Sequence, residues 1–196
     1  MRMPAVSTPM VRAAADLISR GLAVTEIPPG SRIPAPGWQG RATVDVADVR
    51  AWPSGSGVAV ACRASAVVVL DLDRHGPDGL TRWEQLRYAA AGDDQELTFT
   101  VATPHGGLHL YYWCPPGMVV LSASGARSPL GLGIDVRAPG RRSGGYVLAP
   151  GTSTPAGAYQ VGVDRPVRTM PGWLVHILAV PAVGLVDAVS PIDPQS

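Results

Sequence analysis

The sequence contains no lysine and only two cysteines, Cys62 and Cys114. Its 16 basic residues, all arginine, and its 15 acidic residues leave a formal net charge of +1. A charge this small provides no global field for attracting nucleic acid, so any such contact depends on a local basic patch. Two cysteines in or beside apolar runs do not make a disulfide framework, and each is most simply a small buried hydrophobe.

Long apolar runs are also missing. Residues 1–11 lack the hydrophobic core of a signal peptide. The most apolar stretch, 173–186, is interrupted by His176, Pro181 and Gly184 and is shorter than the roughly 20 residues that a spanning helix needs. We therefore predict a soluble, cytoplasmic protein with no membrane partner. Internal repeats, heptads, a Walker-type phosphate loop and zinc-ribbon spacing are absent as well.

The length of 196 residues fits a single domain, and the 23 glycines and 20 prolines indicate short elements joined by many turns. We predict a flexible N-terminal arm over residues 1–9, one domain over 10–180 and a loosely ordered tail over 181–196.

Helical and strand patterns alternate along this domain. Helical spacing is found at residues 9–20, 46–51, 79–91 and 171–180. Strand patterns are found at 22–27, 57–62, 66–73, 97–102, 108–113, 130–136, 145–149 and 158–162. The stretch 92–96 is expected to be an acidic turn and 114–129 to be irregular. Because the second half is rich in strands with short turns, the pattern predicts an α+β fold with a mixed sheet rather than a doubly wound parallel one.

The stretch Ala66–Asp73 is an uninterrupted apolar strand pattern that ends in two carboxylates. Such a run is typical of a strand buried on both faces. Asp71 and Asp73 then point to the same side, with Cα atoms about 6.5 Å apart. They repel each other unless a cation lies between them, and Mg²⁺ or Mn²⁺ is a natural candidate. The alternative is that both are turn or helix-cap residues, since Gly76-Pro77-Asp78-Gly79 follows.

A second polar cluster lies in the strand pattern 108–113. His109 and Tyr111 share the face opposite the leucines of this strand. The preceding Gly106 and Gly107 have no side chains and allow a ligand to approach closely. The alternatives are a histidine satisfied within the sheet, or a zinc ligand acting with His105 and Cys114, which the absence of a second cysteine pair disfavours.

The third cluster is Asp135 and Arg137, which also share one strand face. An acid that binds a metal next to an arginine that binds a phosphate is a coherent pair. The alternative is a simple ion pair, which contributes little to stability if it is exposed.

In their order and spacing these clusters resemble the bifunctional DNA primase/polymerase (Prim-Pol) domain of the archaeo-eukaryotic primase superfamily, over roughly residues 10–162. The stretches that carry the resemblance are 13–20, Arg32-Ile33-Pro34 with Trp38, Ala42-Thr43, 58–60, 68–73, 103–112, 133–137 and 144–150.

The resemblance implies an RRM-like, mixed or antiparallel catalytic sheet with an additional N-terminal α/β unit. It implies that Asp71, Asp73 and Asp135 are catalytic and bind two divalent ions, Mg²⁺ or Mn²⁺. It also implies that His109 is a catalytic residue that contacts the triphosphate of an incoming nucleotide.

Three further positions follow from the same resemblance. Arg137, with the basic loop after it, is an expected phosphate or template contact. Arg32 stands where the family often has a lysine and is expected to bind the nucleotide as well. Gly107 stands where a small hydroxyl residue can precede the histidine, which weakens one expected phosphate contact.

The function that follows is metal-dependent nucleotidyl transfer onto a DNA-templated strand, in the replication of a chromosome-borne or mobile element. The expected partners are template and primer DNA, nucleoside triphosphates, and a separately encoded helicase or other replication protein. Two alternatives remain open: a catalytically silent nucleic-acid-binding replication module, and a metal-dependent nucleotide hydrolase that uses the same acids.

Overall fold

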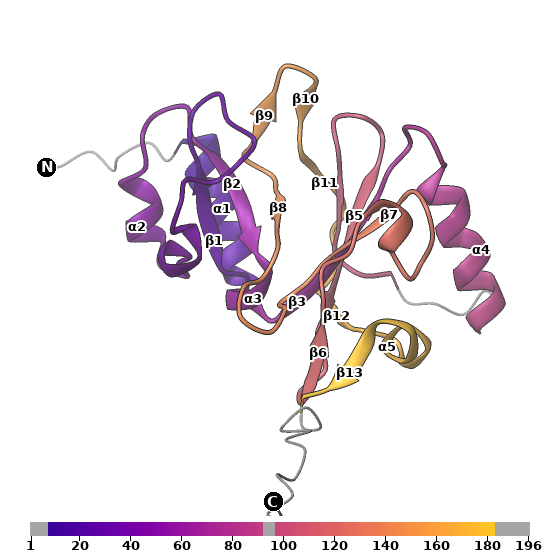
Figure 1. The fold of residues 1–196 in the computed structure, drawn as a ribbon. Coiled ribbons are helices and arrows are strands. Elements are labelled where there is room, and N and C mark those ends of the chain that lie inside the picture. The colour runs from indigo at the N-terminus through magenta and orange to yellow at the C-terminus, as the bar shows by residue number, and fades with distance from the viewer. Residues whose placement is uncertain (1–7, 92–96, 183–196) are drawn as a thin grey trace, which may run out of the picture.

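A six-stranded sheet occupies the centre of the computed structural model, which describes residues 8–91 and 97–182 (Figure 1). Its strand order is β11-β4-β5-β3-β7, and β12 pairs with β5. All pairs are antiparallel except the parallel pair of β12 and β5. These strands are β3 (Val67–Leu72), β4 (Thr100–Ala102), β5 (Leu108–Trp113), β7 (Ile134–Arg137), β11 (Gln160–Val163) and β12 (Arg168–Thr169). The predicted α+β fold with a mixed sheet is confirmed.

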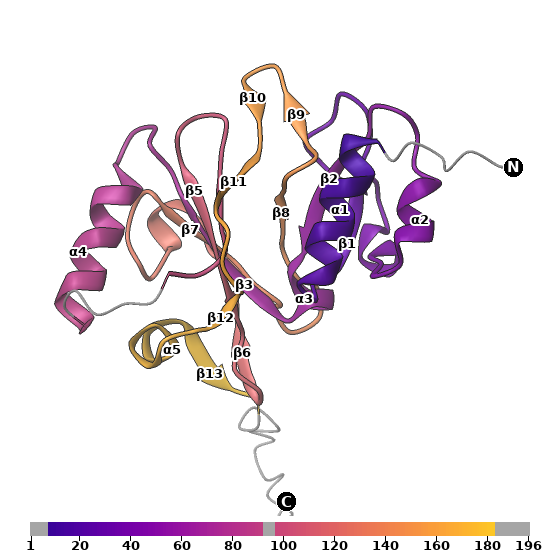
Figure 2. The ribbon, with the colours of Figure 1, turned by 180° about the vertical axis from the view of Figure 1, so that it is seen from behind.

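A smaller antiparallel sheet of order β1-β2-β8 lies beside the first. Its strands are β1 (Val24–Ile27), β2 (Gly57–Ala61) and β8 (Tyr146–Leu148), so the last strand comes from the C-terminal half of the chain. Helix α1 (Pro9–Ser19) covers one face of this sheet, as Figure 2 shows from behind, and α2 (Val46–Arg50) packs beside α1. This is the expected N-terminal α/β unit, and the short helix α3 (Cys62–Ser65) joins it to β3.

Two helices cover the face of the large sheet that is turned away from the small sheet (Figure 1). They are α4 (Gly79–Ala91) and α5 (Gly172–Leu178). The remaining strands form two short ribbons, β6 (Met118–Val120) with β13 (Ala179–Pro181), and β9 (Ser153–Thr154) with β10 (Gly157–Ala158). Single 3₁₀ turns are η1 (Trp38–Arg41) and η2 (Gly125–Arg127). None of the helices in the described part of the chain combines the length and the apolar character that crossing a membrane requires.

Strand β3 is buried on both faces, as its sequence predicts. Val67 and Val69 belong to the core shared with the small sheet and α1. Leu70 and Leu72 belong to a second core beneath α4 and α5. Asp71, between those leucines in sequence, is therefore on the face that looks toward the small sheet.

Several predicted boundaries differ from the structure. The strand predicted over 130–136 begins only at Ile134, because Gly131 and Gly133 adopt left-handed backbone angles in a turn (φ +99° and +85°). The strand predicted over 57–62 ends at Ala61, and Cys62 is the first residue of α3. The strand predicted over 97–102 is shortened to β4.

Other predicted segments are only partly within the described residues. The stretch 114–129 is less irregular than expected, since it contains β6 and η2. Pro9, assigned to the arm, is the first residue of α1, capped by the Thr8 side chain. The rest of the arm (1–7), the acidic turn (92–96) and most of the tail (183–196) lie outside the described residues.

A close backbone crossing fixes the end of β3. The Asp73 N–H donates to the Gly133 carbonyl, and the Gly79 N–H donates to the Asp73 carbonyl, both at 2.8 Å. A Cβ on Gly79 would overlap the Gly133 carbonyl. The crossing therefore requires glycine at position 79, and it holds the backbone of Asp73 from both sides.

We expect Gly79→Ala to lower the free energy of unfolding by about 1–3 kcal/mol, because the added methyl group must push two backbone segments apart. Urea unfolding measures this change. Gly172→Ala, at the exposed first residue of α5 with no atom within 4 Å of the new Cβ, is the matched control and is expected to be neutral or slightly stabilising. Equal stabilities of the two variants would contradict the requirement for glycine at position 79.

Candidate active site

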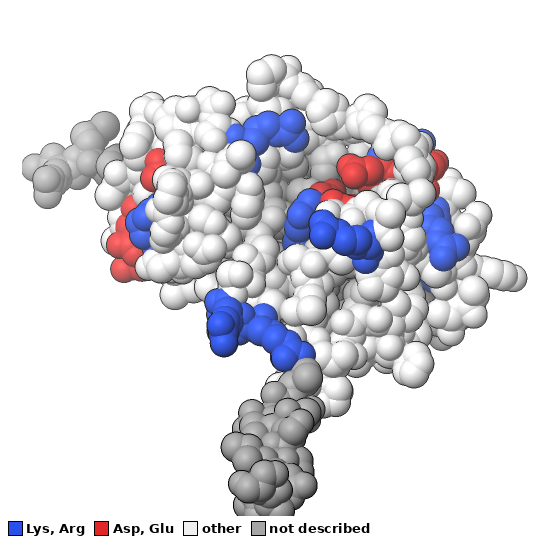
Figure 3. Space-filling view, in the orientation of Figure 1, with Lys and Arg blue, Asp and Glu red and all other residues white. Residues whose placement is uncertain are grey.

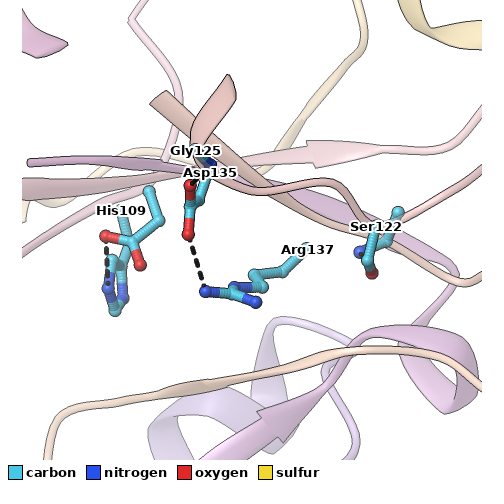
Figure 4. A network of polar contacts seen from close by, with 7 residues as sticks. His109, Ser122, Gly125, Asp135 and Arg137 are labelled. Carbon is cyan, nitrogen blue, oxygen red and sulfur yellow. Dashed lines mark hydrogen bonds and ion pairs between the residues drawn. The ribbon is translucent and has the colours of Figure 1, made fainter. Parts of the chain in front are cut away.

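Three of the predicted polar residues form one row across the large sheet. In the strand register, Asp71 on β3 pairs with His109 on β5 and with Asp135 on β7. Directly paired residues on antiparallel strands present their side chains on the same face. His109 and Asp135 therefore flank Asp71 in the row, and Figure 4 shows Arg137 reaching back toward Asp135. The register therefore brings together residues that lie up to 64 positions apart in the chain.

His109 is the most buried member of the row. Its side chain is 5% exposed, and its Nε2 lies 3.3 Å from Oδ1 of Asp71, whose side chain is 22% exposed. The ring of Tyr159, the residue between β10 and β11, packs on the imidazole with centroids 5.6 Å apart. The other ring nitrogen, Nδ1, is buried without a hydrogen-bond partner among the described residues. This histidine is therefore held rigidly, with one polar atom left for another group to satisfy.

The charge of Asp71 is stabilised by its neighbours. Burial alone raises the pKa of this carboxyl, but the hydrogen bond and charge of His109, together with Arg137, outweigh it and lower the pKa. Asp71 thus remains ionised in the folded protein even though it is half-buried.

Asp135 already has a partner for each oxygen. Its Oδ1 accepts a hydrogen bond from the Gly125 N–H at 2.9 Å, and its Oδ2 accepts one from Nη2 of Arg137 at 2.8 Å. The arginine side chain is 36% exposed and the carboxylate 18%. The ion pair considered from the sequence as an alternative is therefore formed, and it is partly shielded from water.

Asp73 is the exposed member of the group and follows the end of β3. Burial raises the pKa of its carboxyl, and the negative charges of Asp71 and Asp135 raise it further. Asp73 is therefore close enough to Asp71 and Asp135 to be repelled by both. Among the described residues, no arginine or histidine forms an ion pair with Asp73.

These donors fit a hard divalent cation by their chemistry. Carboxylate oxygens are the ligands that Mg²⁺ and Mn²⁺ prefer, and a cation would offset the repulsion felt by Asp73. Within residues 8–91 and 97–182, however, no three Asp, Glu, His or Cys side chains converge as a ready metal-binding group. Asp135 could join such a group only by exchanging its contact with Arg137. The carboxylates are gathered in one place but are not pre-arranged around an ion.

A cleft of about 460 Å³ opens between the two sheets next to this row. In Figure 3, acidic side chains lie in the hollow between the two halves, and arginines border it. Asp71, His109, Arg137 and Arg32 line the cleft, whereas Asp73 and Asp135 lie beside it. The other lining residues are Trp38, Ser122, Ser143, Gly144, Gly145, Tyr146, Val147, Leu148 and Tyr159.

Tyr159 and Arg32 link the two walls of the cleft. Burial raises the pKa of the Tyr159 hydroxyl, and a hydrogen bond with the Arg32 side chain opposes that rise. Arg32 precedes η1, beside the small sheet, whereas Tyr159 packs on His109 of the large one. Sequence patterns alone assigned no role to Tyr159, because nothing in its local pattern indicates that its ring covers His109.

The structure does not bring Gly107 into the cleft. This residue is buried at the start of β5, where its N–H donates to the Thr103 hydroxyl at 3.1 Å. A Cβ here would overlap the Leu72 carbonyl, so glycine is needed to let β5 approach β3. His105 packs against His75, with ring centroids 5.0 Å apart, rather than joining His109 and Cys114.

Comparison with known proteins gives one finding on the whole domain. The family model described as the N-terminal domain of bifunctional DNA primase/polymerase (Prim-Pol) matches residues 14–173. This range contains both sheets and every residue of the row and the cleft. A search of curated proteins found no significant match.

The opposite pKa shifts of Asp71 and Asp73 predict opposite effects on stability. The lowered pKa means that ionised Asp71 stabilises the fold at neutral pH, a contribution lost as the pH falls through the folded-state pKa. The raised pKa means that ionised Asp73 destabilises the fold, increasingly so as the pH rises from the ordinary value through the raised one. At pH 7 we expect Asp71→Asn to cost about 1 kcal/mol and Asp73→Asn to gain about 0.3 kcal/mol, a small value because Asp73 is exposed.

Urea unfolding in the presence of a chelator measures both variants without interference from metal ions. Asp16→Asn, an exposed substitution on α1, is the control and is expected to change little. The same sign of change in Asp71→Asn and Asp73→Asn would contradict the electrostatic description of the site.

Proposed function

Because the chain belongs to the family of bifunctional DNA primase/polymerase N-terminal domains, we propose that the cleft between its two sheets is the active site of DNA-templated nucleotidyl transfer. The observation that carries this proposal is the row of Asp71, His109 and Asp135, which the strand register gathers next to a cleft lined by arginines. In this reaction a 3′ oxygen forms a bond to the α-phosphorus of a nucleotide, and the bond to pyrophosphate breaks.

We propose that Asp71, Asp73 and Asp135 hold divalent ions, Mg²⁺ or Mn²⁺. When bound, such ions activate the attacking oxygen and offset the charge of the leaving pyrophosphate. The chain's own contribution is a group of three carboxylates, and the raised pKa of Asp73, which comes first from burial and then from the charges of Asp71 and Asp135, supports this proposal. Arg137 would leave Asp135 when the site is loaded, since one oxygen of Asp135 is engaged by this arginine.

His109, Arg137 and Arg32 are the proposed contacts to the phosphates. His109 is fixed in position by Asp71 and Tyr159, so it orients its partner without a large loss of its own conformational freedom. Arg137 is half-exposed and has a planar donor fork suited to phosphate oxygens. Arg32 faces them from the opposite wall of the cleft.

The loop 138–144 after β7 is a proposed template contact. It carries Arg141 and Arg142, both exposed, and its backbone is held by the Arg63 guanidinium, which donates to the Arg141 carbonyl at 2.7 Å. A local cluster of this kind is what a protein of net charge +1 needs to bind the phosphates of DNA. The domain would act in the cytoplasm, in replication, together with a separately encoded helicase or other replication protein.

One observation favours a second candidate, a catalytically silent nucleic-acid-binding module. Both oxygens of Asp135 are engaged within the chain, and no three metal-ligating side chains converge among the described residues. In that case the acids would stabilise the fold around the cleft rather than bind an ion. The nucleotide hydrolase considered from the sequence differs from both candidates because it needs no template.

We expect the full chain to extend a labelled primer on a DNA template only when Mg²⁺ or Mn²⁺ is present. Asp71→Asn and Asp135→Asn are each expected to reduce incorporation at least a hundredfold, because positioning and electrostatics supply most of the rate enhancement. Circular dichroism establishes that the variants remain folded. Asp16→Asn, an exposed position on α1 that does not line the cleft, is the control and is expected to retain full activity.

Three results would contradict the proposal. Template-independent release of phosphate from free nucleotide would favour the hydrolase. Template binding by the wild type without incorporation would favour the silent module. Undiminished incorporation by Asp71→Asn would remove the carboxylate row from the mechanism.

A further inference from the structure

The wall of the cleft opposite the acids is aromatic. It is formed by Trp38 of η1 and Tyr146 of β8, which come from the small-sheet side. Their ring centroids are 5.4 Å apart with an interplanar angle of 73°, an edge-to-face pair. The Tyr146 hydroxyl also lies 3.4 Å from the Arg32 carbonyl, which ties the pair to the segment that carries Arg32.

Edge-to-face packing leaves aromatic surface available to a ligand. The ring that offers its edge keeps both of its faces free of the other ring. Both residues are half-buried. Tyr146 packs partly against the core beneath α1, but Trp38 belongs to neither of the two core clusters. Trp38 therefore presents a large apolar ring at the cleft that no hydrophobic core within the described residues uses.

We infer that Trp38 and Tyr146 form a stacking platform for the base of the incoming nucleotide. The inference rests on the proposed function, because it places the phosphates of that nucleotide at His109 and Arg137. The cleft then has one wall with His109 and Arg137 for the phosphates and an opposite, aromatic wall for the base, from which Arg32 also reaches the phosphates. Its volume of about 460 Å³ is in the range typical of a site for one small ligand.

Stacking suits a templated reaction. Each of the four bases has a π-face, so an aromatic platform binds every nucleotide and leaves the choice of base to pairing with the template. A pocket that reads the edge of a base by hydrogen bonds would instead favour one nucleotide. Trp38 and Tyr146 offer mainly ring surface, and the Tyr146 hydroxyl is already directed at the Arg32 carbonyl.

The test separates binding of the base from binding of the phosphates. Calorimetry on the full chain in Mg²⁺ measures Kd for dATP, for dCTP and for inorganic tripolyphosphate, which has no base. We expect Trp38→Leu to weaken both nucleotides about tenfold, equivalent to about 1.4 kcal/mol, and to leave tripolyphosphate unchanged. Trp38→Phe, which keeps an aromatic face and the fold, is expected to restore most of the affinity.

Two comparison variants complete the design. Arg137→Gln is expected to weaken nucleotides and tripolyphosphate alike, since it alters the phosphate wall. Tyr88→Leu, at an aromatic residue of α4 that is 69% exposed and outside the cleft, is the matched control and is expected to alter neither.

Other outcomes overturn the inference. Unchanged nucleotide affinity in Trp38→Leu, or an equal loss for tripolyphosphate, would remove the platform while leaving the proposed function intact. If a further titration with a short single-stranded oligonucleotide shows weakened binding in Trp38→Leu while both nucleotides bind as tightly as before, Trp38 contacts the template and the inference is overturned. A wild-type protein that binds neither dATP nor tripolyphosphate would overturn the proposed function, and the platform with it.

Discussion

The pairing of β3 between β5 and β7 is the interaction on which the rest of the site depends. In this register Asp71 has His109 on one side and Asp135 on the other. The register is fixed by apolar side chains, since Val67 and Val69 pack into one core and Leu70 and Leu72 into the other. A shift of one residue would turn Asp71 toward α4 and bury an unpaired charge. The hydrophobic pattern of β3 therefore determines where the carboxylates lie.

The carboxylates around this row differ in how far neighbouring positive groups compensate their charge. Asp71 and Asp135 are each compensated, by His109 and by Arg137. Asp73 forms no such ion pair among the described residues, and burial together with the charges of the two neighbouring carboxylates raises its pKa. A fold selected only for stability would have little reason to retain that repulsion, whereas perturbed ionisable groups beside a cleft are typical of functional sites. The same balance explains why Arg137 is engaged in the free protein, where it neutralises Asp135.

The cleft exists because the small sheet contains strands from both halves of the chain. Strand β8 follows β7 in the chain, yet it pairs with β2 of the small sheet. This connection places Tyr146 beside Trp38, on the wall of the cleft opposite His109. The charged wall and the aromatic wall of the cleft therefore belong to different sheets. Movement of one sheet relative to the other would alter the distance between the two walls.

The sequence by itself determined the strands that carry Asp71, His109 and Asp135, and the family, whereas Asp73, predicted to be the last residue of its strand, lies beyond the end of β3. Alternation along β5 is a local property, so His109 and Tyr111 were assigned correctly to the face opposite Leu108 and Leu110. Tertiary structure alone decided that Arg137 and Gly125 engage Asp135, that Tyr159 covers His109 and that Gly107 packs against β3 instead of lining the cleft. Most of these contacts join segments far apart in the chain, and a contact between distant segments leaves no periodic pattern in either of them.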